Sequence, residues 1–187
     1  MPDYDKKIYL TFDDGPTPDV TDALLDILKN YGAKATFFCL GKNVLENKSL
    51  FDEIRKEGHQ IGNHTWDHLN SKKVGTGEYI NSISKTKELI NSKLFRPPYG
   101  RITKEQANLI SNNFKIVMWS VLSRDFDLNQ SKEKCLSTVL KHTKAGSIIV
   151  FHDSMKASIQ MLYTVPKVLD YYQKKGFEFS AINDELV

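Results

Sequence analysis

The sequence of 187 residues has only two cysteines, no long apolar run and no large excess of charge. Two thiols in a chain of this length do not make a disulfide framework, so we expect Cys39 and Cys135 to be buried and free. A membrane-spanning helix needs about 20 apolar residues in a row, so we expect no membrane span. The net charge of +3, with Lys and Arg interleaved with Asp and Glu, offers no basic tract for nucleic acid.

The composition, with 40% hydrophobic and 26% charged residues, is that of an ordinary soluble globular protein. The length suits one domain with a sizeable core, and no linker, low-complexity segment or repeat divides it. We therefore predict a single domain over residues 1–187 and a monomer. Residues 1–12 lack the long apolar core of a signal peptide, which leaves a cytoplasmic and an exported protein both open.

Short strand-like runs alternate with segments of helical periodicity along the whole chain. The predicted strands are residues 8–12, 35–38, 60–63, 94–96, 115–119, 147–151 and 178–181. The predicted helices are residues 20–31, 50–57, 79–91, 103–112, 132–142 and 165–175. Seven strands alternating with helices predict an α/β domain with a mainly parallel sheet. The short units fit either a compact barrel or an open sheet.

Reactive side chains follow five of the predicted strands. In chain order they are Asp13 with Asp14, His64 with His68, Arg96, Asp125, and His152 with Asp153. Parallel α/β folds bind ligands at the carboxyl ends of their strands. We therefore expect these five segments to meet at one site.

The segment HTWDH places His64 and His68 four residues apart, on one face of a helical turn or in a tight loop. Surface histidines often have this spacing, so the pair alone is weak evidence. A nearby carboxylate would complete a His, His, Asp set with open positions for water and substrate, which is typical of catalytic zinc. Thr65 stands where the zinc peptidase motif HExxH has its glutamate, so that class lacks its general base here.

The adjacent carboxylates of Asp13 and Asp14 precede the turn Gly15-Pro16. One of them could bind a metal while the other accepts a proton from a water, or the pair could simply cap the next helix. Arg96 is either a surface residue before a rigid Pro-Pro turn or the partner of a buried carboxylate. Beside Asp13 it would lower the pKa of that carboxyl by roughly one to three units.

Two more segments fit acyl-transfer chemistry. Behind the two prolines, the backbone N–H of Tyr99 could point at an oxyanion. His152 ends a buried-looking strand, and an imidazole oriented by Asp125 suits a general acid near neutral pH. A histidine packed in the core is the alternative for His152.

The motifs TFDDGP, NHTWDH, RPPYG, VLSRDF and IIVFHD occur in this order between Thr11 and Asp153. In this combination they resemble the polysaccharide deacetylase family, carbohydrate esterase family four, and the likeness extends over nearly the whole chain. The resemblance implies a distorted, incomplete TIM-like (β/α)7 barrel. It also implies a divalent metal, with zinc as the first choice and cobalt or nickel as alternatives.

The resemblance further implies roles for individual residues. The metal ligands are Asp14, His64 and His68. The catalytic residues are Asp13 as base, His152 as general acid, Arg96 as support for Asp13 and Asp125 as partner of His152. The substrate-binding residues are Tyr99, whose N–H helps hold the oxyanion, and Pro97, Phe126 and Val150.

Three positions depart from the family pattern. Leu122 and Phe126 replace the first Asp and the Trp of the fourth motif, which affects the pocket wall. Val150 replaces a Leu that commonly lines the acetyl methyl, a loss of one methylene worth about 1 kcal/mol. The aromatic rings of Trp66 and Tyr99 could stack on sugars or be ordinary packing.

The sequence thus predicts a hydrolase that removes N-acetyl groups from glycans containing N-acetylglucosamine, such as chitooligosaccharide or peptidoglycan. The metal activates a water and the acetyl carbonyl, Asp13 takes the proton of the water, and His152 protonates the departing amine. One alternative is a deacetylase of O-acetylated sugars or non-sugar amides. Another is a catalytically silent carbohydrate-binding protein on the same fold. A phosphohydrolase is disfavoured because no glycine-rich phosphate cradle accompanies the paired Asp.

Overall fold

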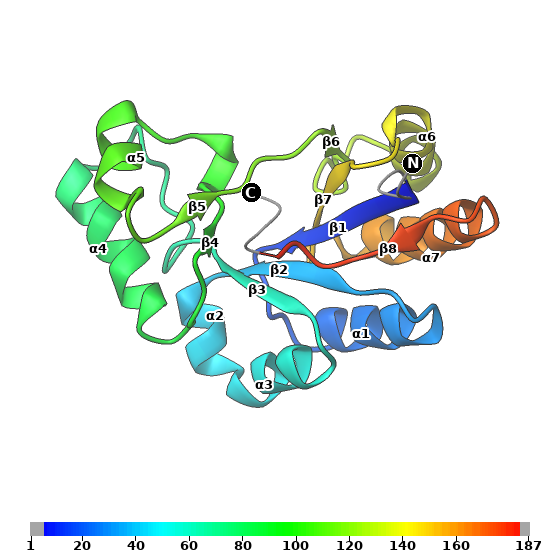
Figure 1. Cartoon of the computed structure of the whole chain (residues 1–187), viewed down its shortest axis with the longest axis horizontal. Coiled ribbons are helices and arrows are strands. Elements are labelled where there is room, and N and C mark those ends of the chain that lie inside the picture. The colour runs from blue at the N-terminus through cyan, green and yellow to red at the C-terminus, as the bar shows by residue number, and fades with distance from the viewer. Residues whose placement is uncertain (1–5, 184–187) are drawn as a thin grey trace.

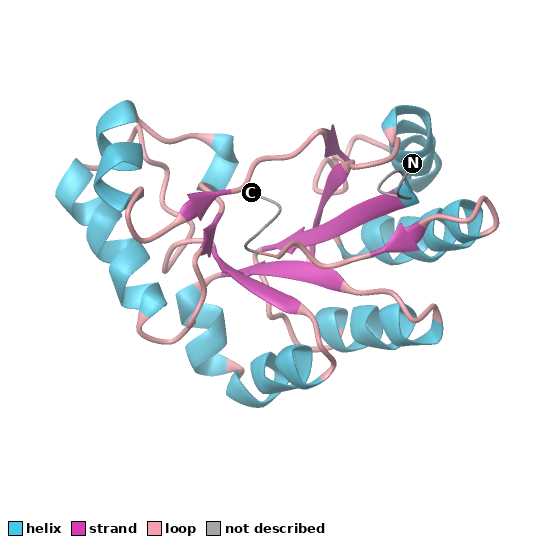
Figure 2. Cartoon of the chain, in the orientation of Figure 1, coloured by secondary structure: helices cyan, strands magenta, loops and turns pink. Residues whose placement is uncertain are grey.

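The computed structural model describes residues 6–183, which form a curled sheet with helices on its outer side (Figures 1 and 2). The strands are β1 (Lys7–Asp13), β2 (Ala35–Cys39), β3 (Gln60–Asn63), β4 (Leu94–Phe95), β5 (Lys115–Ile116), β6 (Val121–Leu122), β7 (Ile148–His152) and β8 (Glu178–Phe179). The helices are α1 (Val20–Asn30), α2 (Gly41–Glu46), α3 (Lys48–Lys56), α4 (Thr76–Lys87), α5 (Lys104–Ile110), α6 (Lys132–His142) and α7 (Ser158–Gln173), and a short 3₁₀ turn, η2, covers Pro98–Gly100.

The sheet is parallel throughout the described residues. Its strand order is β5-β4-β3-β2-β1-β7-β6, and β8 pairs with β1 beside this path. Strands β5 and β6 form the two ends of the path and stand apart in Figure 1. The barrel is therefore incomplete, as predicted, and all its strands direct their carboxyl ends toward the same side.

The central strand β1 shows how the sequence sorts side chains to the two faces of the sheet. Successive side chains of a strand point to opposite faces. Ile8, Leu10 and Phe12 belong to the main hydrophobic core, and the ring of Phe12 packs on those of Phe37 and Phe151 with centroids 5.2 and 5.9 Å away. The alternate residues include Thr11 and Asp13, which contact Arg96 on the inner face. Alternation thus delivers Asp13 to the inside of the barrel.

The predicted fifth strand, residues 115–119, is wrong in its second half. Only its first two residues form a strand, β5, and a separate strand that was not predicted, β6, follows at Val121–Leu122. The carbonyl oxygens of Val117 and Met118 accept hydrogen bonds from the Arg96 guanidinium, at 3.1 and 3.4 Å. These carbonyls bind a side chain instead of a neighbouring strand, so the chain leaves β5 here and crosses over to pair with β7.

The last helix, α7, begins at Ser158, seven residues before the predicted start at residue 165, and Pro166 lies within it. Proline inside a helix costs about 3 kcal/mol because one backbone hydrogen bond is lost. Met161, Val165 and Val168 are all fully buried. Each such side chain contributes about 1.5–3 kcal/mol on burial, which outweighs the cost of the proline. Helix α2 was not predicted either.

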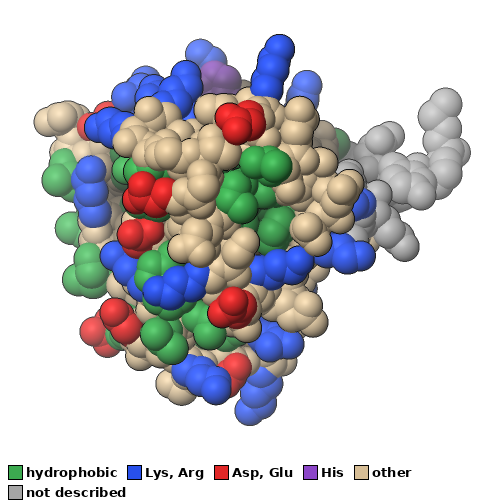
Figure 3. Space-filling model, turned by 90° about the vertical axis from the view of Figure 1, so that its left-hand side faces the viewer, with side chains coloured by type: hydrophobic (Ala, Val, Ile, Leu, Met, Phe, Trp, Pro, Cys, Tyr) green, Lys and Arg blue, Asp and Glu red, His purple; other side chains and the backbone are tan. Residues whose placement is uncertain are grey.

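The outer surface carries both signs of charge. On the face covered by α4 and α5, basic and acidic side chains are interspersed (Figure 3). Cys39 and Cys135 are buried free thiols, as predicted. Between residues 6 and 183, the structure contains no helix with the length and apolarity required to span a bilayer.

Candidate active site

The residues predicted at the strand ends meet in one pocket of about 470 Å³. Nine of them line it: Asp13, Asp14, His64, His68, Pro97, Tyr99, Phe126, Val150 and His152. Arg96 and Asp125 lie behind the wall, both 0% exposed. The five chain segments therefore converge, and two of the predicted residues act on the pocket only through others.

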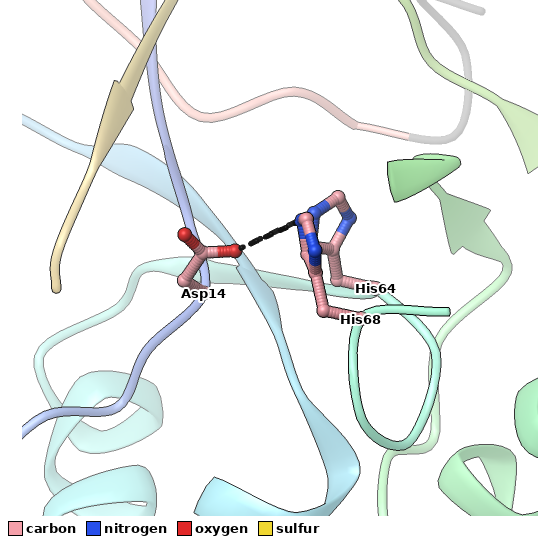
Figure 4. Close-up of side chains that lie close together, drawn as sticks. All are labelled: Asp14, His64 and His68. Atoms are coloured by element: carbon pink, nitrogen blue, oxygen red, sulfur yellow. Dashed lines mark ion pairs between the residues drawn. The ribbon is translucent and has the colours of Figure 1, made fainter. Parts of the chain in front are cut away.

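Asp14, His64 and His68 form a compact group of possible metal ligands (Figure 4). Asp14 Oδ1 lies 3.7 Å from His64 Nε2 and 3.4 Å from His68 Nε2. Two ligands at zinc-bond lengths of 2.0–2.1 Å and a tetrahedral angle would be about 3.3 Å apart. Asp14 Oδ1 is also buried with no hydrogen-bond partner among the described residues. An unpaired buried carboxylate oxygen facing two imidazole nitrogens is what a divalent cation requires.

A backbone carbonyl fixes the orientation of the first histidine, His64. His64 Nδ1 lies 2.7 Å from the carbonyl oxygen of Arg96. Because a carbonyl can only accept, Nδ1 carries a proton and Nε2 keeps its lone pair for the metal position.

The second histidine depends on a loop, since HTWDH is a tight loop here and not a helical turn. Its backbone is tied to α2, because Gly41 N and Lys42 N donate to the carbonyls of Thr65 and Trp66, both at 3.0 Å. Side chains tie it further, because Trp66 N donates to Ser82 Oγ on α4 at 2.9 Å. His68 is thereby held opposite His64, with the two ring centroids 5.1 Å apart.

Asp13 is paired with a buried cation. Arg96 Nη1 donates to Asp13 Oδ1 at 2.8 Å and to Thr11 Oγ1 at 2.6 Å. Burial alone raises the pKa of Asp13, but the charges of Arg96, His64 and His152 outweigh it and hold the pKa below its ordinary value. Asp13 Oδ2, 4.0 Å from His64 Nε2, is the oxygen that faces the group of possible metal ligands.

His152 is paired with a buried carboxylate. Its Nδ1 lies 2.8 Å from Asp125 Oδ1, and its backbone N–H donates to Asp125 Oδ2 at 2.7 Å. Burial alone lowers the pKa of His152, but Asp125, with smaller contributions from Asp13 and Asp14, raises it to about 9. Because Nδ1 faces Asp125, the other ring nitrogen, Nε2, is the one left to exchange a proton in the pocket.

Strained backbone is concentrated at this site. Among the described residues, six that are not glycine have φ between +59° and +85°, in the left-handed region that side chains disfavour. Five of the six lie in the motifs, namely Asp14, Thr65, His68, Tyr99 and Arg124. Such strain persists only where the surrounding contacts enforce it, and it is typical of functional sites.

Sequence reasoning missed the part played by Asp153, which is fully buried. Its Oδ1 accepts from Gly15 N at 2.9 Å and its Oδ2 accepts from Thr21 Oγ1 at 2.7 Å. A Cβ on Gly15 would collide with the Asp153 carboxylate, so the turn after Asp14 needs glycine. The only available signal was its place directly after His152.

Two aromatic residues also differ from expectation. Trp119, which was not singled out, lines the pocket, whereas Trp66 does not. Trp66 packs against the site of Gly41, and Lys85 Nζ lies 3.5 Å from the centre of its ring. Of the two possibilities for Trp66, the structure supports ordinary packing.

Known proteins resemble this chain in both sequence and fold. The polysaccharide deacetylase family model matches residues 2–116. A peptidoglycan-N-acetylglucosamine deacetylase of Bacillus cereus is 34% identical over 193 residues, which cover 100% of this chain and 91% of that protein. The peptidoglycan-N-acetylglucosamine deacetylase PgdA of Listeria monocytogenes is 37% identical over 185 residues, 96% of this chain but only 38% of PgdA. This chain thus spans well under half the length of PgdA.

A solved structure gives the same result at the level of the fold. The Bc1960 peptidoglycan N-acetylglucosamine deacetylase matches with a TM-score of 0.89 and 36% identity, covering 94% of this chain and 86% of that chain. Three observations indicate the same family: the incomplete parallel barrel, the order of the five motifs and the similarity to these relatives. The chain belongs to the polysaccharide deacetylase family, carbohydrate esterase family four.

Proposed function

We propose that this chain is a single catalytic domain, active as a monomer, that removes N-acetyl groups from glycans containing N-acetylglucosamine. One observation carries the proposal: the carboxyl group of Asp13, paired with Arg96, and the imidazole of His152, paired with Asp125, line the same pocket as the three possible metal ligands. Asp13 and His152 are register partners on the adjacent strands β1 and β7. A hydrolase needs a base and an acid so placed, whereas a protein that only binds sugar needs neither.

We propose zinc as the metal held by Asp14, His64 and His68, with cobalt and nickel as substitutes. Two imidazoles and one carboxylate suit these ions and leave further coordination positions open. When bound, such an ion supplies a Lewis acid that polarises an acetyl carbonyl and lowers the pKa of a water.

The base is Asp13, acting through Oδ2. Arg96 occupies Oδ1, so only Oδ2 is available to accept a proton from the attacking water. The lowered pKa keeps this carboxyl ionised at neutral pH. General-base assistance of this kind contributes about 10²- to 10⁴-fold to the rate.

The acid is His152, which protonates the departing amine through Nε2. Its raised pKa keeps the ring protonated at neutral pH, and Asp125 fixes its direction through two hydrogen bonds. The bonds then balance: water adds to the acetyl carbon, the carbon–nitrogen bond breaks, Asp13 gains a proton and His152 loses one. Free acetate and a glucosamine unit leave.

The acyl group is positioned by the remaining residues of the pocket. The Tyr99 N–H is the proposed donor to the oxyanion, and the positive φ of Tyr99 sets its direction. Leu122, Phe126 and Val150 form the proposed apolar wall for the methyl group, with Pro97 nearby. Leu122, where the family has Asp, adds to this apolar wall.

The test is acetate release from a panel of defined substrates after the protein has been stripped of metal and reconstituted with zinc, cobalt or nickel. The panel contains N-acetylglucosamine oligomers, O-acetylated xylooligosaccharides and small N-acetyl amides. We expect release from the N-acetylglucosamine oligomers only after metal is restored. Release confined to O-acetylated sugars or to small amides would favour the other deacetylase, and binding of oligomers without any release would favour a carbohydrate-binding protein.

A further inference from the structure

The rim of the pocket carries charge of only one sign. Beyond the carboxylates of Asp13 and Asp14 and the three histidines, the charged residues that line the pocket are Arg101 and Lys156. Both side chains are exposed, and neither forms an ion pair with another described residue. Two unpaired cations at the mouth of a catalytic pocket are therefore available to a substrate.

The two cations lie on opposite sides of the reaction centre. Arg101 follows β4 and η2, whereas Lys156 follows β7. In the strand order, β3, β2 and β1 lie between β4 and β7. The ligand residues Asp14 and His64 follow β1 and β3, so a polymer that crosses the pocket over them would meet one cation on each side.

Both cations are presented by hydrogen-bonded turns. Gly100 N donates to Pro97 O at 3.0 Å and Arg101 N donates to Pro98 O at 3.2 Å. A Cβ on Gly100 would lie 2.6 Å from the Trp119 ring, so this turn is seated directly on that side chain. On the other side, Ala157 N donates to Ser154 O at 3.0 Å, and the fully buried Ala157 anchors the turn that carries Lys156.

Exposed apolar side chains accompany each cation. Tyr99, two residues before Arg101, is 59% exposed, and Met155, next to Lys156, is 69% exposed. Apolar surface of this kind suits the faces of sugar rings, while a cation beside it suits a negatively charged substituent on the same sugar. Each cation thus has an exposed apolar side chain close to it in the sequence, and of these two side chains Tyr99 lines the pocket.

We propose that Arg101 and Lys156 make this pocket selective for an anionic glycan, each by binding a carboxylate on the sugar unit that flanks the N-acetylglucosamine under attack on its own side. This inference rests on the proposed function. Exposed ion pairs are weak, about two- to fivefold in KM for each cation, and are screened by salt. The preference is therefore on the order of tenfold at low ionic strength.

The experiment compares three oligomers with the metal-reconstituted protein. The first alternates N-acetylglucosamine with N-acetylmuramic acid, whose lactyl group bears the carboxylate. The second is the same oligomer with that carboxylate converted to a methyl ester, which removes the charge and keeps the shape. In the third, a short peptide on the lactyl group moves the carboxylate outward and distinguishes a sugar-borne source from a peptide-borne one.

We expect kcat/KM for the carboxylate oligomer to exceed that for the ester by about tenfold in dilute buffer, and the ratio to approach one in concentrated salt. The double variant Arg101→Gln/Lys156→Gln should reduce this ratio to near one, mainly through KM. Lys141→Gln, an exposed lysine on α6, is the matched control and should leave the ratio unchanged.

Equal rates on the acid and the ester, or a ratio that survives the double variant, would overturn the inference while leaving the deacetylase proposal intact. Absence of acetate release from all three oligomers and from N-acetylglucosamine oligomers would instead overturn the proposed function itself. A preference seen only with the peptide-bearing oligomer would likewise overturn the inference, because the carboxylate recognised would then be borne by the peptide and not by the sugar.

Discussion

Two buried charges support the pocket from opposite sides, and they are opposite in sign. On one side the cation Arg96 holds the carboxylate Asp13, and on the other the carboxylate Asp125 holds the imidazole His152. Both contacts are 2.8 Å long, and both supporting residues are fully buried. The two pairs are thus built alike, with a buried ion behind a titratable group that faces the pocket.

The difference in sign separates the pKa values of the two pocket residues. Burial raises the pKa of Asp13, yet Arg96 and the nearby histidines bring it below the ordinary value. Burial lowers the pKa of His152, yet Asp125 brings it up to about 9. At neutral pH one group is therefore an available base and the other an available acid, which is how environments assign such roles.

The pairs also differ in how much else each supporting ion holds. Arg96 donates in addition to Thr11 and to the carbonyls of Val117 and Met118. Asp125 accepts from two atoms of a single residue, His152. Arg96 is therefore part of the architecture between β4 and β6, whereas the side chain of Asp125 holds His152 alone.

Removing the base should have the largest effect on rate. Asp13→Asn keeps an oxygen for Arg96 but cannot accept a proton, so we expect kcat to fall by about 10²- to 10⁴-fold. Acetate release gives the rate, and elemental analysis should show an unchanged metal content. Asp170→Asn on α7 is the matched control for loss of an exposed carboxylate. An Asp13→Asn variant with the parental rate would remove Asp13 as base.

Removing the supporting cation, Arg96, should instead mainly lower the stability of the fold. Arg96→Met leaves Asp13 buried without its partner, which lowers the free energy of unfolding by roughly 3–5 kcal/mol. Urea denaturation followed by circular dichroism measures this change. Asp125→Asn removes a partner of only one residue, His152, so it should lower the free energy of unfolding by clearly less than Arg96→Met does. Equal destabilisation by the two variants would contradict the architectural difference between the pairs.

The sequence was sufficient to predict most of this arrangement. The five motifs and the alternation of elements predicted the incomplete barrel and the convergence of Asp13, Asp14, His64, His68 and His152. The convergence depends on local periodicity and on a topological rule, which a sequence carries directly. The incomplete barrel was implied by the resemblance to the family, because the alternation of elements alone fits an open sheet as well.

What could not be predicted depends on contacts between distant residues. The early end of β5, at Ile116, follows from the guanidinium of Arg96, which binds the carbonyls of Val117 and Met118 in place of a strand partner. Asp153 holds the turn after Asp14 by accepting hydrogen bonds from Gly15 and Thr21, which are 138 and 132 residues away in the sequence. No periodicity records such pairings, so only the folded chain reveals them.

The pH dependence of the acid offers a finer test of the comparison. In the proposed mechanism His152 acts in its protonated form, so activity should fall on the alkaline side as pH rises through its pKa. Asp125 raises that pKa, so Asp125→Asn should move the alkaline limb of kcat/KM to lower pH. At a pH above both pKa values, the variant should be slower than the parent protein by about tenfold for each pH unit by which the limb has moved. An unchanged limb in a folded, metal-loaded variant would exclude His152 as the titrating acid.

The smallest expected effect concerns the wall between the two pairs. Val150 lies on β7 beside Thr11 and Leu122, is 1% exposed and lines the pocket. Val150→Leu adds one methylene, worth about 1 kcal/mol or roughly fivefold in discrimination between acyl groups of different length. We expect the ratio of kcat/KM for N-acetyl over N-propionyl oligomers to rise by this factor, because the enlarged side chain leaves less room for the longer acyl group.

The same variant leaves both charged pairs untouched, so its pH profile should match that of the parent protein. Phe126 provides the contrast, because its ring packs edge-on against His152 with centroids 5.1 Å apart. Phe126→Trp should therefore alter both acyl selectivity and the alkaline limb, whereas Val150→Leu should alter selectivity alone. If Val150→Leu moved the pH profile while leaving the acyl ratio unchanged, Val150 would act through the acid, and the apolar wall would not be the acetyl-binding surface.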